Sequence, residues 1–92
     1  MIDRSHPDLR LMLKRNPNAS DALCAAMLRV KAAERAVRDA DGAIEDFRAS
    51  IFSGGRTTAT DEENAHGESL VAAAAAAEAE LDAARKQLAV TV

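Results

Sequence analysis

Apolar residues recur every seven positions through the middle of this chain, and a second series follows three residues after most of them. The first series is Leu23, Val30, Val37, Ile44 and Ile51, and the second is Ala26, Ala33, Ala40 and Phe47. These spacings place both series on one stripe of an α-helix, at the a and d positions of four heptads. A helix with such a stripe buries it against another helix, so the pattern predicts a helical pair.

A second apolar stripe follows a break at residues 53–55. It continues with spacings of three and four, and its members are Gly67, Leu70, Ala74, Ala77, Leu81, Ala84 and Leu88. When the stripes are paired antiparallel so that residue numbers add up to 114, large residues oppose small ones at most layers, which fills space without voids. Phe47 then faces Gly67, and Val30 faces Ala84. We therefore expect a long antiparallel hairpin in this register.

Residues that start and stop helices divide the chain. Pro7 suits the first turn of a helix, and Asn18 is the expected N-cap of the next one, with Asp21 completing the cap. Thr60 and Glu63 fit the capping box of the last helix. The expected elements are a short helix over 7–15, a long helix over 18–52, a loop over 53–60 and a long helix over 61–89.

Composition bounds the stability of this hairpin. The chain has 92 residues, of which 22 are Ala and two are Phe, with no Trp or Tyr. Burial contributes roughly 0.8 kcal/mol per carbon, so each Ala adds little, and a chain this short buries only about 60% of its unfolded surface. The predicted fold is therefore all-α: a single domain over 1–92, built as an Ala-rich, coiled-coil-like antiparallel hairpin with a short N-terminal helix. We expect it to assemble into a multi-helix bundle.

Charge is nearly balanced, with a net charge of −3 at pH 7. Residues 1–35 carry a net +3 and residues 36–92 a net −6. This polarity favours contacts between like chains as much as contacts with an acidic partner. A small basic cluster near the N-terminus is diluted by acidic neighbours and has no aromatic residue to stack on bases, so nucleic acid is not an expected partner. Its members are Arg4, Arg10, Lys14 and Arg15.

Targeting and membrane signals are not recognised in the sequence. The N-terminus is charged and lacks the apolar core of a signal peptide, and the apolar run at 70–77 is mostly Ala and too short to cross a membrane. The single cysteine, Cys24, excludes an intramolecular disulfide and is expected to be structural. The expected location is cytoplasmic or virion-associated.

A second surface rich in small residues lies outside the predicted seam. It comprises Ala25, Leu28, Ala32 and Ala36 on one helix, and Val71, Ala75, Ala79 and Ala83 on the other. Small residues allow helices to approach closely, and the N-terminal helix could cover part of this surface. The rest is the predicted interaction site for a partner protein, either another copy or a component of a larger assembly.

One pattern resembles a metal-binding motif. Glu63 and His66 have the Glu-x-x-His spacing that di-iron four-helix proteins use. The antiparallel register also brings Glu45 or Asp46 of the facing helix near His66 as a third candidate ligand. The competing interpretation is structural, because Glu63 already belongs to the capping box and both residues lie at the start of a helix. We therefore predict no metal and no other cofactor, and keep Glu63, His66 and Asp46 as the candidate ligands.

The turn Phe52-Ser53-Gly54, near the middle of a helical hairpin of this length, resembles the Trp-x-Gly turn of small secreted type VII substrates. The resemblance covers three residues and an overall shape. The tryptophan is replaced here, the loop to the next helix is longer, and no Tyr near the C-terminus supplies the usual export motif. The chain is not assigned to that family.

The sequence as a whole predicts a non-enzymatic helical interaction or assembly module, of structural, adaptor or chaperone-like type. No Ser or Cys has the partner pattern of a catalytic nucleophile. Richness in Ala, Arg and Asp is typical of a GC-rich bacterium or its phage. Two alternatives remain: a host-directed inhibitor or adaptor that binds through the hairpin tip and the basic N-terminus, and an oligomeric carboxylate/His metal-binding bundle.

Overall fold

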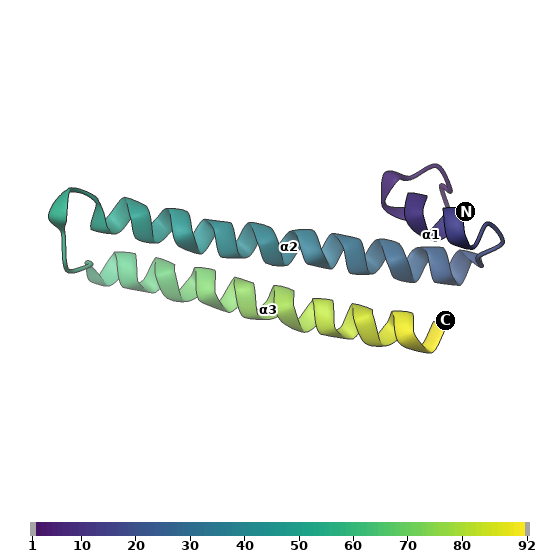
Figure 1. Ribbon diagram of the computed structural model, residues 1–92. Helices are drawn as coiled ribbons and strands as arrows, with labels where there is room; N and C mark the ends of the chain where they lie inside the picture. Colours follow the sequence, from purple (N-terminus) through teal and green to yellow (C-terminus); the bar gives the residue numbers. More distant parts are fainter. Residues whose placement is uncertain (1, 92) are drawn as a thin grey trace.

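Two long antiparallel helices joined by a short loop form the body of the protein, and the architecture is all-α, as predicted (Figure 1). The computed structural model describes residues 2–91. A short N-terminal segment packs on the side of the first long helix that faces away from the second in Figure 1. The elements are η1 (Pro7–Leu9), α1 (Arg10–Arg15), α2 (Asp21–Phe52), η2 (Ser53–Gly55) and α3 (Asp61–Thr91).

The hairpin is elongated rather than globular. Its principal dimensions are 56 × 22 × 19 Å and its radius of gyration is 18.2 Å, against about 13 Å for a compact domain of 100 residues. The length follows from α2, whose 32 residues rise about 1.5 Å each. No helix in the described part of the chain combines the length and apolarity needed to cross a membrane.

Element boundaries differ from the predicted ones at two places. The long helix α2 begins at Asp21 instead of residue 18, because Ser20 takes the N-cap position that Asn18 was expected to fill. The Ser20 hydroxyl accepts a hydrogen bond of 3.1 Å from the backbone N–H of Leu23. Asn18 lies in the turn after Pro17. At the other end α3 continues to Thr91, beyond the predicted end at residue 89.

The predicted antiparallel register is present in the structure. A Cβ atom built on Gly67 would lie 3.0 Å from the Phe47 ring, so these two residues oppose each other as expected. Further along, Val30, Ala33 and Ala84 form one buried cluster, to which Leu81 and Leu88 add their side chains. Large residues therefore pack against small ones along the seam, which allows the two helices to approach closely.

The N-terminal segment closes one end of the hairpin. Leu9 of η1 and Cys24 of α2 are fully buried, and Ala19 joins them in a second core cluster. Asp8 also accepts a hydrogen bond of 2.8 Å from the guanidinium of Arg35. The turn between α1 and α2 thus folds the short helix back onto α2, where its apolar side chains find a partner.

Candidate interaction surface at the hairpin tip

The hairpin turns through two glycines at the end of α2. Gly54 and Gly55 have φ values of 70° and 85°, in the left-handed region that residues with a Cβ atom rarely adopt. The Ser53 hydroxyl donates a hydrogen bond of 3.1 Å to the carbonyl of Ser50 in the last turn of α2. The chain therefore leaves α2 abruptly and reaches α3 through residues 56–60.

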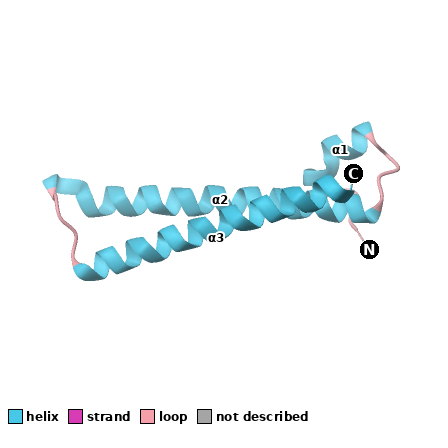
Figure 2. Cartoon of the chain, turned by 90° about the horizontal axis from the view of Figure 1, so that it is seen from below, coloured by secondary structure: helices cyan, strands magenta, loops and turns pink. Residues whose placement is uncertain are grey.

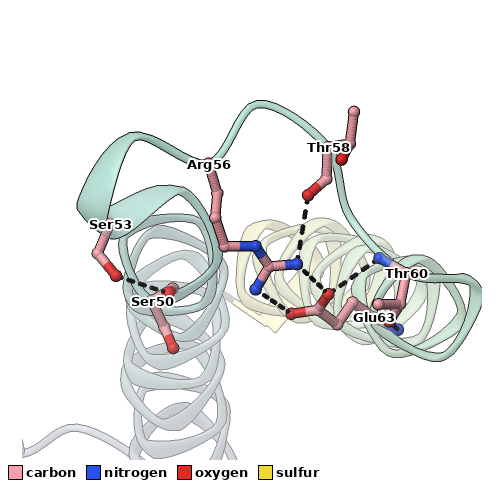
Figure 3. A network of polar contacts seen from close by, with 6 residues as sticks. All are labelled: Ser50, Ser53, Arg56, Thr58, Thr60 and Glu63. Atoms are coloured by element: carbon pink, nitrogen blue, oxygen red, sulfur yellow. Dashed lines mark hydrogen bonds and ion pairs between the residues drawn. The ribbon is translucent and has the colours of Figure 1, made fainter.

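An arginine–glutamate pair ties this loop to the first turn of α3 (Figure 3). The Arg56 guanidinium donates two hydrogen bonds to the Glu63 carboxylate, of 2.6 and 3.1 Å. Thr60 and Glu63 also form the predicted capping box: the Thr60 N–H donates to the carboxylate, and the Glu63 N–H donates to the Thr60 hydroxyl. Hydrogen bonds from Arg56 and from the Thr60 backbone lower the pKa of Glu63 to about 2. This carboxylate is thus charged and structurally engaged at neutral pH.

An apolar groove of about 510 Å³ lies between α2 and α3 next to this loop. In Figure 2 the two helices lie apart near the loop and overlap near the other end, whereas in Figure 1 they lie side by side along their length, so they cross each other at an angle. The groove is lined by Ile44, Phe47, Arg48, Ile51, Phe52, Ala59, Glu63, Asn64, Gly67, Glu68, Leu70, Val71, Ala72 and Ala75. Two of its large apolar side chains stay open to solvent, because Phe52 is 49% and Val71 is 53% exposed.

Phe47 spans the gap between the two helices within this groove. Its ring packs against the backbone of Gly67. It also meets the imidazole of His66 edge to face, with ring centroids 5.0 Å apart and an interplanar angle of 69°. Such pairs are a favoured aromatic geometry. Phe47 therefore holds α2 and α3 together at the tip, and the rest of the groove stays unfilled.

The two walls of the groove carry opposite charges. Arg48 stands on the α2 wall and Glu68 on the α3 wall, and both are exposed. Neither forms an ion pair within the described residues, in contrast to Arg29, which forms two hydrogen bonds with Glu80 across the same hairpin. The groove thus has an apolar floor with an available cation on one side and an available anion on the other.

The candidate metal ligands are engaged in other contacts. Glu63 and His66 lie one turn apart on α3, as their spacing predicts, but Glu63 binds Arg56 and Thr60 while His66 packs on Phe47. Asp46 is exposed on α2. Among residues 2–91 of a single copy, no group of three or more His, Cys, Asp and Glu side chains is close enough to hold a metal ion.

The eight residues predicted to form an interaction surface lie in different places. Leu28 is half-buried against the N-terminal cluster around Leu9. Val71 and Ala75 line the groove at the tip. The remaining five are exposed along α2 and α3: Ala25, Ala32, Ala36, Ala79 and Ala83. The structure therefore brings two of the eight into the groove and places one under the N-terminal segment.

Sequence reasoning missed the groove residues on α2, namely Arg48 and Phe52, and their counterpart Glu68. A signal was present in the pair Ile51-Phe52, because two neighbouring large apolar residues cannot both face one helical seam. Ile51 is buried and Phe52 is left outside the seam. The groove itself has no counterpart in the heptad pattern.

Among the four residues of the basic N-terminal cluster, Arg4 alone forms an ion pair within the described residues. Arg4 pairs with Asp21 at 2.8 Å, at the first residue of α2. A hollow of about 450 Å³ separates α1 from α2, with Leu11, Met12 and Met27 among its apolar residues and Arg15 and Lys31 among its basic ones. This hollow is a secondary candidate for binding.

The chain matches no protein-family model, no curated protein and no solved structure in comparisons with known proteins.

Proposed function

We propose that the protein is a non-enzymatic assembly module that packs the tip of its hairpin against helices of a partner. The partner that we propose is another copy of the chain. The observation that supports this proposal is the groove at the tip. Phe52 of α2 and Val71 of α3 both line it, and each is about half exposed to solvent. Grouped exposed apolar side chains on a small protein are typical of an interaction site.

The energetics of the hairpin favour the same proposal. Five of the nine buried apolar residues in the described part of the chain are Ala, and the largest side chains that are completely buried there are Leu9 and Cys24. A domain of this size is only marginally stabilised by its own core. Packing a further helix into the groove would remove the Phe52 and Val71 side chains from water, at about 25 cal/mol per Å². Assembly therefore adds apolar burial that the hairpin itself lacks.

Sedimentation equilibrium over a wide concentration range, with helix content followed by circular dichroism, tests this function. We expect the wild type to form an oligomer. The variant Val71→Asp should keep its helix content and associate at least about tenfold more weakly, because an unpaired carboxylate is costly to bury. Leu11→Asp is the matched control, since Leu11 is 71% exposed at the opposite end. A well-folded wild-type monomer at every concentration would overturn the proposal.

A second candidate function is a host-directed inhibitor or adaptor. It is favoured by the hollow beside α1, where apolar residues lie next to the basic side chains of Arg15 and Lys31. In a pull-down from host lysate, a protein retained by the wild type and lost with both Leu11→Asp and Val71→Asp would support this alternative. Equal recovery with the wild type and both variants would count against it.

A further inference from the structure

The groove at the tip is self-complementary in charge, which indicates the kind of partner that it fits. Its floor is apolar, its α2 wall carries Arg48 and its α3 wall carries Glu68. The residue numbers of this pair add up to 116, close to the value of 114 that defines the register of the seam. Arg48 and Glu68 therefore lie at nearly the same height along the hairpin, on opposite walls.

We infer that two copies of this chain bind each other groove to groove at their tips, pointing in the same direction, so that Arg48 of each copy pairs with Glu68 of the other. A two-fold axis along the hairpin places α2 of one copy against α3 of its partner. Every neighbouring pair of helices is then antiparallel, as in an up-and-down four-helix bundle. This inference rests on the proposed assembly function and specifies how two copies of the chain pair.

A second pair of charges supports the same arrangement. Arg38 lies two heptads before Phe52, and Glu78 lies one heptad after Val71, so each falls in line with a residue of the groove. Their numbers also add up to 116. Both are exposed and form no ion pair within the described residues. Two copies related by the proposed axis would therefore match Arg38 with Glu78 as well as Arg48 with Glu68. On the same lines, Glu45 falls opposite Val71 and Asp41 opposite Ala75.

Charged residues further from the tip disfavour an interface that extends along the whole length of the two hairpins. Continuing the same lines by heptads brings Glu34 opposite Asp82, and Lys31 opposite Arg85. Both are pairs of like charge, which repel across a helical interface. The N-terminal segment already covers α2 in that half, where Lys31 lines the hollow beside α1. The proposed interface is thus confined to the tip half, over roughly residues 38–52 and 63–78.

Alternative pairings predict different charge contacts. If the two-fold axis ran across the hairpin, α2 would face α2 of the second copy, and an interface centred on residues 38–52 would place Glu45 near Glu45 of the other copy. That arrangement puts like charges together at the centre of the interface. Opposite charges on the two walls therefore favour the arrangement with both tips at the same end.

Charge reversal tests this pairing without disturbing the apolar floor. The variants Arg48→Glu and Glu68→Arg should each keep their helix content and dimerise about tenfold more weakly by sedimentation, since each homodimer contains two repulsive pairs. An equimolar mixture of the two variants should associate within about threefold of the wild type, because both cross-copy pairs are then of opposite charge. Asp39→Arg, an exposed acidic position outside the groove, is the matched control for the change in net charge and should dimerise like the wild type.

The outcomes separate this inference from the function on which it rests. A wild-type oligomer with both charge variants unimpaired would overturn the groove-to-groove pairing and leave the assembly function standing. Weakened single variants that fail to recover on mixing would also overturn it, because the charges would then act within one copy or toward a different partner. A wild-type monomer at all concentrations would overturn both proposals.

Discussion

The two ends of this hairpin share one seam but differ in how their outer apolar residues are covered. At the N-terminal end a short helix folds back onto α2, and Leu9 and Cys24 are completely buried. At the tip no third element is present among the described residues, and Phe52 and Val71 remain about half exposed. The comparison shows that the N-terminal segment buries apolar side chains against α2, although it leaves its own Leu11 71% exposed, and that no described element does the same at the tip.

The difference follows from what each end can bury. The seam near the N-terminal end holds Val30, Ala33 and Ala84 in close contact, and the N-terminal segment adds Leu9 outside it. At the tip the aromatic ring of Phe47 is wedged against Gly67, and the loop is held by polar contacts of Arg56 and Glu63. One end is therefore stabilised by apolar burial, and the other by a turn and a capping box.

The largest expected effect is a loss of stability at the N-terminal end of the hairpin. Leu9→Ala removes a fully buried side chain, and we expect the free energy of unfolding to fall by about 2–5 kcal/mol, measured by chemical denaturation. Leu11→Ala is the control, because Leu11 is 71% exposed and its truncation should change stability by less than about 0.5 kcal/mol. Equal losses for the two variants would show that the N-terminal segment does not pack as described.

A smaller loss of stability is expected when the N-cap of α2 is removed. Ser20→Ala removes the hydroxyl that accepts a hydrogen bond from the Leu23 N–H and should destabilise the protein by about 1 kcal/mol in the same assay. Asn18→Ala serves as the comparison, because Asn18 lies outside α2. If Asn18→Ala cost more than Ser20→Ala, the helix would begin at the earlier cap that the sequence suggested.

Substituting Ala for Gly42, in the middle of α2, and for Gly67, near the tip, compares how tightly the two regions are packed. Ala replaces Gly in a helix with a gain of about 1 kcal/mol, and a Cβ atom on Gly42 would meet nothing within 4 Å. Gly42→Ala should therefore raise the thermal midpoint. Gly67→Ala should gain less or lose stability, because its Cβ atom would press on the Phe47 ring. Identical shifts in the midpoint would contradict the tight contact at the tip.

The smallest effect concerns the pH dependence of the tip. The pKa of Glu63 is about 2 in the folded protein against an ordinary value of 4.5, so the unfolded state binds more protons between these values. The stabilising contribution of Glu63 is complete above about pH 4.5 and is lost as the pH falls toward 2. Thermal unfolding of Glu63→Gln should show a shallower acid dependence in this window. Glu62→Gln, whose carboxylate makes no hydrogen bond or ion pair within the described residues, should retain the wild-type slope.

Particular residues show how far the candidate site could be predicted. The capping box of Thr60 and Glu63 follows from short-range spacing and is present. The same capping contacts engage the Glu63 carboxylate, whereas its contact with Arg56 depends on the loop conformation. The exposed Phe52 and the charged walls of the groove could not be predicted, because they depend on how the two helices pack at the tip.

The sequence by itself determined the all-α hairpin and its register, because heptad spacing and the alternation of large and small residues are local properties that admit few pairings. It also determined where the loop lies, since Gly54 and Gly55 are compatible with a left-handed turn. Only the tertiary structure decided that Ser20 caps α2, that the N-terminal segment packs on one end of the hairpin, and that an apolar groove remains at the other. These features depend on contacts between residues distant in sequence, whose energies are small individually and are settled only when the whole chain packs.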